Sequence, residues 1–231
     1  MDREKAFEGI MNCINVLILV MIAVLYAATG TRLGEDAIAA MKTGGIYRGG
    51  RSGTVALACS VTWDAENLSD MLDTLEERGV QITFFVSGEW ARSHASTLER
   101  MTAAGHEIGT SGYAPLLDGD LETVQTDISV SAAVISSITG QSTRLYYAGL
   151  REPSLSQAAG EAAGLVRIAG SADLLSARGE AADIVARASE QAFDGSILVL
   201  QPTAQAAEAL PAMIDAIHEK GYRIGPVGGM I

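Results

Sequence analysis

Residues 54–88, TVALACSVTWDAENLSDMLDTLEERGVQITFFVSG, decide the fold. The segment 54–61 is apolar and rich in residues that favour strands, and residues 80–88 form a second stretch of the same kind. Between them, residues 65–79 place apolar side chains at helical spacing and end on a glycine: Leu68, Met71, Leu72, Leu75 and Gly79. Because both strands are apolar along their whole length, this order indicates two parallel strands joined by a covering helix.

The same alternation continues to the end of the chain. Helices are expected at 89–105, 120–140, 154–164, 180–193 and 204–221, and strands at 106–110, 144–149, 165–170, 196–202 and 222–227. Seven strands alternating with helices predict an α/β fold with a parallel sheet, either a small distorted barrel or an open doubly wound sheet. No GxGxxG or phosphate-loop pattern follows the first strand, so nucleotide binding has little support.

The composition is that of a folded, acidic protein. Of the 231 residues, 48% are hydrophobic and only 19% are charged, which favours a packed core over disorder. The net charge is −12, and no cluster of Lys and Arg interleaved with aromatics occurs, so we expect no nucleic-acid partner. The two cysteines, Cys13 and Cys59, read as buried small hydrophobic residues rather than as a disulfide or a catalytic thiol.

The N-terminus predicts a membrane anchor. Residues 10–29 carry no charged side chain, and as a helix they would span about 30 Å, the thickness of the hydrocarbon core. Arg3 and Lys5 precede this segment, which favours a cytoplasmic N-terminus at 1–9 and everything after the anchor outside the cell membrane. A cleaved signal peptide is the alternative. Residues 30–52 are expected to form a stalk, and residues 53–231 the folded domain.

In parallel α/β folds, ligands bind where the strands end. The expected strand ends are rich in hydroxyls, amides and aromatics, and none of them carries a histidine. His94 and His218 fall inside predicted helices, and His106 begins a strand, where a structural role at the opposite end is expected. Because a catalytic zinc needs about three converging N, O or S ligands, this histidine pattern argues against one.

Acidic residues offer a second possible chemistry. Asp64 and Glu66 follow the first strand, and Glu89 and Asp173 end two others, so paired carboxylates could support general acid–base hydrolysis of a glycan. The simpler interpretation is that Asp64 or Glu66 caps the following helix. Ser60 lacks a visible histidine base and is read as lining the core rather than as a nucleophile.

Several segments together resemble the NodB-homology polysaccharide deacetylases, especially the sporulation-associated branch. The resemblance covers residues 46–231 and is carried by 55–91, by GHEIGTSGY at 105–113, by RLYYAGL at 144–150 and by 197–224. It implies a distorted seven-stranded (β/α) barrel. It also implies a zinc ion held by an Asp and two His, an Asp base that activates water, and a His acid that protonates the leaving amine of an N-acetyl sugar.

This chain departs from the family pattern wherever that pattern carries chemistry. Ser60 stands at the position of the base, Ala148 at that of the catalytic arginine and Gln201 at that of the acid histidine. The metal positions are occupied by Val61, Ser111 and Pro115. Serine and glutamine neither hold zinc well nor lower the pKa of a bound water. We therefore expect no catalytic residue, no metal and no cofactor at these positions.

The positions around the strand ends predict binding instead. The candidates are Trp63, Asp64, Glu66, Trp90, Tyr113, Arg151 and Gln201. The leading hypothesis is a membrane-anchored, deacetylase-like pseudoenzyme of the cell envelope that binds a peptidoglycan-like cell-wall glycan or an envelope protein. An active metal-dependent N-acetyl-sugar deacetylase with unusual ligands is the alternative, and a purely structural envelope component is a third hypothesis.

Overall fold

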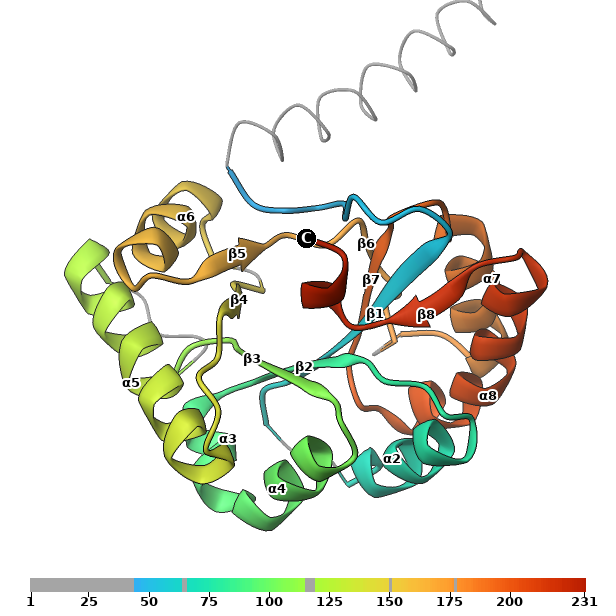
Figure 1. Ribbon diagram of the computed structural model, residues 1–231, viewed down its shortest axis with the longest axis horizontal. Helices are drawn as coiled ribbons and strands as arrows, with labels where there is room; N and C mark the ends of the chain where they lie inside the picture. The colour runs from blue at the N-terminus through green and yellow to red at the C-terminus, as the bar shows by residue number, and fades with distance from the viewer. Residues whose placement is uncertain (1–43, 64–65, 115–118, 150, 177) are drawn as a thin grey trace, which may run out of the picture. The chain divides into compact units, whose positions relative to one another are not determined.

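The computed structural model describes residues 44–231 other than 64–65, 115–118, 150 and 177. Its parallel strands form one sheet in the order β5-β4-β3-β2-β1-β7-β6, and β8 lies off this path and pairs with β1 (Figure 1). The strands are β1 (Thr54–Val61), β2 (Thr83–Val86), β3 (Glu107–Thr110), β4 (Leu145–Tyr147), β5 (Val166–Ile168), β6 (Ala172–Asp173), β7 (Ile197–Leu200) and β8 (Arg223–Gly225).

Helices cover the outer face of this sheet and leave its inner face to line the half-barrel (Figure 1). They are α2 (Leu68–Glu77), α3 (Gly88–Ser93), α4 (Ala95–Ala103), α5 (Leu121–Thr139), α6 (Pro153–Ala162), α7 (Ala181–Gln191), α8 (Ala204–Glu219) and the short 3₁₀ turn η1 (Val227–Gly229). Local signals set several ends. Asp120 caps α5 by accepting from Thr123 N, and Gly140 ends this helix in a left-handed conformation.

Strand β1 is the centre of the sheet. Its first half pairs with β8 and its second half with β2 on the same side, while β7 pairs with it on the other side. All eight of its residues are buried. Val55, Leu57 and Cys59 join the core under the helices, whereas Ala56 and Ala58 join the core inside the half-barrel. The alternation of a strand therefore turns Ser60 toward the inside.

The alternating α/β order predicted from the sequence is confirmed, with two differences. The loop after β5 contains an additional two-residue strand, β6, which is too short to leave a sequence pattern. The helix predicted at 89–105 is two helices that meet at His94, whose φ of −129° and ψ of 40° are not helical. The His94 Nδ1 atom lies 3.1 Å from Trp90 O, so this side chain bonds to the backbone one turn back.

Residues 44–50 connect β5 to the start of β7 (Figure 1). Ile46 forms a bridge with Ile168 of β5, and Arg48 forms one with Ser196 next to β7. Gly49 N donates to Gly195 O at 2.8 Å. The stalk predicted at residues 30–52 includes this segment. These hydrogen bonds, which no sequence period reveals, make Gly44–Ile231 the compact unit.

No helix of the described residues is both long and apolar enough to cross a membrane. The anchor predicted at 10–29 and its signal-peptide alternative lie outside the described residues, so both stay predictions.

Gly49 tests how far the bridging segment stabilises the domain. A Cβ atom at Gly49 would lie 2.6 Å from Met230 Cβ, whereas one at the neighbouring Gly50 would meet only Met230 O, at 3.9 Å. Gly49→Ala should lower the free energy of unfolding by about 1–3 kcal/mol because the crowded segment must shift. In urea denaturation, Gly50→Ala should be neutral or slightly stabilising. Equal stability of the two variants would contradict a structural role for this segment.

A buried polar network fills the amino end of the half-barrel. Glu107 Oε2 accepts from Thr83 Oγ1 at 2.6 Å and from Gly228 N at 2.9 Å, which ties η1 to the strands. His106 is buried beside this network. Its Nδ1 atom accepts from Ile82 N at 3.2 Å, and its ring meets Phe84 edge to face. The structural role predicted for His106 is therefore confirmed.

His106 should make the stability of the domain depend on pH. Burial, and then the charge of Arg100, lower the pKa of His106 from 6.5 to about 4. Between these values the unfolded chain binds a proton that the folded domain excludes. The free energy of unfolding should therefore fall as the pH is lowered from 6.5 toward 4, by at most about 1.4 kcal/mol per pH unit. Denaturation series of wild type and His106→Gln should differ in this slope; identical slopes would contradict the assignment.

Candidate functional site

The carboxyl ends of the central strands lie side by side. Val61 of β1 is in register with Val86 of β2, and Val86 is in register with Thr110 of β3. On the other side of β1, Cys59 is in register with Leu200 of β7. Ser60, Ser111 and Gln201, each at or just past one of these ends, therefore belong to one edge of the sheet, which we call the strand-end centre.

The inner face of the sheet provides the floor of the strand-end centre. Phe85 and Tyr147 pack there with ring centroids 5.4 Å apart, and burial, followed by the charge of Asp173, raises the pKa of Tyr147 to about 12. Gly109 faces the same side, because a Cβ atom at this position would lie 2.5 Å from the Phe85 ring. By alternation along β3, Ser111 also faces inward.

Ser111 is the polar group of this centre whose environment is most unusual. The residue is only 4% exposed, and its Oγ atom has no hydrogen-bond partner among the described residues. Such a group is costly to bury, and a bound molecule could satisfy it. Ser60 is buried on β1, with β2 between it and β3, and Gln201 is half-buried. The Gln201 backbone is held by Ser176, whose Oγ accepts from Gln201 N at 2.7 Å.

Two residues that stand where the family pattern expects a metal ligand and the catalytic arginine do not face the strand-end centre. Val61 packs into the outer core beneath the helices. Ala148 belongs to a cluster that Tyr146 forms with α5 and α6. Neither side chain can contribute to chemistry, and both positions are explained by packing alone.

The donor set at this edge does not fit zinc. Val61 has no donor atom, Ser111 offers a neutral hydroxyl, and Pro115 lies outside the described residues. Within the described part of the chain, no group of three or more His, Cys, Asp or Glu side chains is arranged to hold a metal ion. Zinc is held by thiolate, imidazole and carboxylate groups, so we derive no step through a metal here.

The two predicted tryptophans have different environments. Trp63, just past β1, is 59% exposed, which is unusual for so large an apolar side chain. Trp90 is only 4% exposed and stacks on His94 with ring centroids 4.8 Å apart. Helix α3 therefore turns the Trp90 ring into the outer core, and the binding role predicted for it stays a prediction.

Arg151 is also not an open binding residue. Its Nη2 atom donates to Asp127 Oδ2 of α5 at 2.9 Å and to Ala114 O at 2.7 Å, and its side chain is only 8% exposed. The hydrogen bonds to Asp127 and Tyr146 outweigh the effect of burial and raise the pKa of Arg151. The fork of this guanidinium thus holds a loop rather than reaching solvent.

Asp127 is the site residue that the sequence analysis missed. Its Oδ1 atom accepts from Ala114 N at 2.7 Å, and its backbone oxygen accepts from Tyr113 N at 3.2 Å. The available signal was its place on the buried stripe of the helix predicted at 120–140, which comprises Val124, Asp127, Ile128, Ser131 and Ile135. A carboxylate on such a stripe needs a buried partner.

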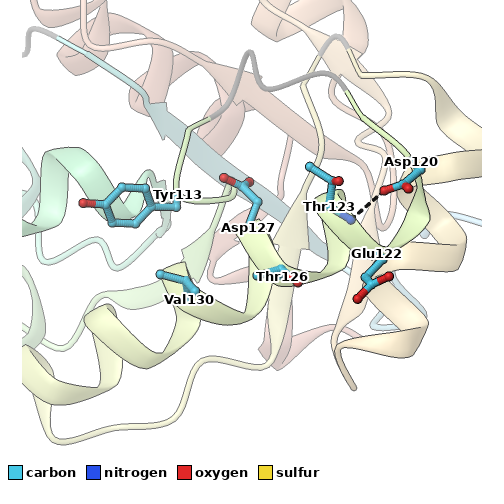
Figure 2. A pocket seen from close by; sticks show the side chains of 7 residues that line it. All are labelled: Tyr113, Asp120, Glu122, Thr123, Thr126, Asp127 and Val130. Carbon is cyan, nitrogen blue, oxygen red and sulfur yellow. Dashed lines mark hydrogen bonds between the residues drawn. The ribbon is translucent and has the colours of Figure 1, made fainter.

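An open pocket of about 460 Å³ lies beside the strand-end centre, on the N-terminal half of α5 (Figure 2). It is lined by Tyr113, Asp120, Glu122, Thr123, Thr126, Asp127 and Val130. Tyr113 is half-buried, and its hydroxyl accepts from Arg92 Nη1 at 3.1 Å. Of the predicted binding residues that the structure describes, only Tyr113 lines this pocket.

The two acidic binding candidates, Asp64 and Glu66, are not seen to join the strand-end centre among the described residues. Asp64 lies outside the described residues. Glu66 is exposed, and the residue at the cap of α2 is Asn67, so the predicted capping by Glu66 is wrong. Glu66 forms no hydrogen bond with Ser60, Ser111 or Gln201, so a paired-carboxylate mechanism has no geometric support among the described residues.

Comparison with known proteins agrees with this description. The family model for polysaccharide deacetylases matches residues 51–164, which include β1–β4 and the helices between them. The chain belongs to the polysaccharide deacetylase family.

One relative in sequence and two solved structures of a second protein are similar to this chain. It is 27% identical over 187 residues to the uncharacterized protein YlxY of Bacillus subtilis, a match that covers 75% of this chain and 56% of YlxY, so the chain spans little more than half of that relative. The fold is similar to a CE4-family pseudoenzyme from Bacillus anthracis, with a TM-score of 0.73, 23% identity and coverage of 80% and 68%. A mutant of that pseudoenzyme with restored enzymatic activity gives a TM-score of 0.74 at 24% identity, covering 80% of this chain and 70% of the mutant.

Ser111 can be tested against a partnered serine. Ser111→Ala removes a hydroxyl without a described partner, so the free energy of unfolding should stay the same or rise by up to about 1 kcal/mol. Ser131 is the matched control: it is fully buried, and its Oγ accepts from Thr110 Oγ1 at 2.7 Å. Ser131→Ala should cost about 1–3 kcal/mol. If Ser111→Ala cost as much in urea denaturation, Ser111 would have a structural partner.

Proposed function

We propose that this protein is a catalytically inactive polysaccharide deacetylase-like protein that binds an N-acetyl-sugar glycan of the cell envelope. The anchor predicted at residues 10–29 would hold the domain at the outer face of the membrane, within reach of such a glycan. The proposal separates two properties of the family, recognition of a sugar and hydrolysis of its acetamide. In this protein, sugar recognition would be retained and hydrolysis of the acetamide would be absent.

One observation carries the proposal: an inward-facing, unpartnered Ser111 hydroxyl lies at the same carboxyl end of the sheet as Ser60 and Gln201, and the exposed Trp63 follows β1 at that end. Hydroxyl and amide groups match the hydrogen-bonding groups of a sugar in both directions, since each can donate and accept. An aromatic face beside such groups supports the apolar face of a sugar ring. This combination suits binding.

The same residues do not suit hydrolysis. Attack on an acetamide needs an activated water, and neither Ser60 nor Gln201 has a pKa or charge that would activate one. Gln201 stands where the family pattern expects the acid histidine, and an amide cannot transfer a proton to a leaving amine. The similarity of the fold to a CE4-family pseudoenzyme supports a non-catalytic member of the family as a realistic outcome.

Trp63 gives the direct test. Titration of the full-length protein with a β-1,4-linked N-acetylglucosamine tetramer should show binding, and Trp63→Ala should weaken it about tenfold, a loss of about 1.4 kcal/mol. The matched control is Phe193→Ala, which removes another exposed aromatic, next to the amino end of β7, and should leave the affinity unchanged. Acetate should not accumulate in either case.

Three outcomes would contradict the proposal. Stoichiometric release of acetate that depends on an added divalent metal would establish the active deacetylase instead. Equal loss of affinity in Trp63→Ala and Phe193→Ala would place the glycan elsewhere. If the tetramer does not bind to the wild type, the domain does not recognise this sugar, and a protein partner becomes the better hypothesis.

A further inference from the structure

The first residues of the β3–α5 loop are held by hydrogen bonds from outside the loop. Tyr113 N and Ala114 N both donate to Asp127 of α5, the former to its backbone oxygen and the latter to its carboxylate. Ala114 O accepts from Arg151 Nη2 at 2.7 Å. Both polar groups of the Ala114 backbone are therefore satisfied by one ion pair.

This ion pair joins three parts of the fold. Asp127 comes from the second turn of α5, and Arg151 from the connection between β4 and α6. Arg151 Nη1 also lies 3.4 Å from the hydroxyl of Tyr146 in β4. The side chains of Asp127 and Arg151 are only 3% and 8% exposed, so their interaction is little weakened by water or salt. Figure 2 shows the Asp127 carboxylate directed from α5 toward the segment that carries Tyr113.

Gly112 allows this arrangement. Its φ of +94° favours glycine, and a Cβ atom would collide with Asp127 Oδ2 and lie 2.9 Å from Arg151 Nη1. The loop backbone therefore passes directly against the ion pair. Gly112 also accepts from Gly88 N at 3.1 Å, which connects the loop to the start of α3.

We propose that the Asp127–Arg151 pair organises this loop in a metal-independent way and so positions Ser111 and Tyr113 for binding. The family positions in this loop cannot hold zinc, as argued above, so metal binding is not available to fix its conformation. A buried ion pair supplies fixed geometry instead, because the guanidinium, through Nη2, and the carboxylate bind each other and each bind the loop backbone. Asp127 and Arg151 are positioning residues and need not touch the ligand.

Removal of one partner alone would leave the other charge buried and uncompensated, and the domain could unfold. The informative variant is therefore Asp127→Asn combined with Arg151→Met, which removes both charges and retains much of the side-chain volume. The matched control is Asp73→Asn combined with Arg100→Met, which removes an exposed ion pair between α2 and α4. Arg151→Lys keeps the charge but loses the fork, and an intermediate effect is expected.

Amide hydrogen exchange of the full-length protein measures directly how well the loop amides are protected. The amide of Ala114 should exchange about tenfold or more faster in the Asp127/Arg151 variant, because its carboxylate acceptor is replaced and Ala114 O loses its Arg151 donor. The neighbouring Tyr113 amide should follow as this segment loosens, while the amides of β1 stay protected. The control variant should leave both loop amides unchanged, and EDTA should alter neither amide in the wild type. The inference is overturned if the loop amides keep their protection in the Asp127/Arg151 variant, or if EDTA lowers it in the wild type.

Binding of the N-acetylglucosamine tetramer gives the second readout, which rests on the proposed function. The Asp127/Arg151 variant should bind about tenfold more weakly than the wild type, and Arg151→Lys should lie between them. Wild-type affinity in a folded Asp127/Arg151 variant would show that the pair does not position the binding residues. If the wild type itself does not bind the tetramer, the proposed function fails, and the exchange measurement still decides whether the pair organises the loop.

Discussion

The hydrogen bonding of β1 to three other strands is the constraint on which the rest of the structure depends. Its residues pair with β2, β7 and β8, and every one of them is buried, so no part of the strand can shift without breaking a ladder. A slip by one residue would turn Leu57 and Cys59 into the half-barrel and Ser60 into the helical layer. The small side chains of Ala56 and Ala58 suit the inside, where Phe85 and Tyr147 take up the space.

The two ends of the half-barrel differ in how their polar groups are satisfied. At the amino end, Glu107 and Thr83 bind each other and the backbone of η1, and His106 accepts from Ile82 N. At the carboxyl end, Ser111 has a buried hydroxyl without a described partner, and Trp63 is exposed. The amino end also keeps one buried atom without a described partner, His106 Nε2, whose ring packs against Phe84 of the outer core. At the carboxyl end, the unsatisfied Ser111 hydroxyl instead faces the inside of the half-barrel, where a bound molecule could satisfy it.

The residues at the expected metal positions of the β3–α5 loop do not fit zinc, so another interaction must fix the conformation of this loop. A metal would tie such a loop to the rest of the site, and a hydroxyl at Ser111 cannot do so. The contacts of Asp127 and Arg151 with Ala114 show how side chains from a helix and a neighbouring loop can hold the same segment. This segment is therefore held by contacts between protein groups.

The sequence by itself determined the alternation of strands and helices, the parallel sheet, the family and the substituted family positions. It could do so because the periodicity of apolar residues and the identity of residues at strand ends are local properties. Tertiary structure alone decided that Trp90 packs into the outer core, that Arg151 pairs with Asp127, and that residues 44–50 connect β5 to the start of β7. Each of these contacts joins segments or faces whose relative placement depends on how the helices pack, and no spacing along the chain encodes that placement.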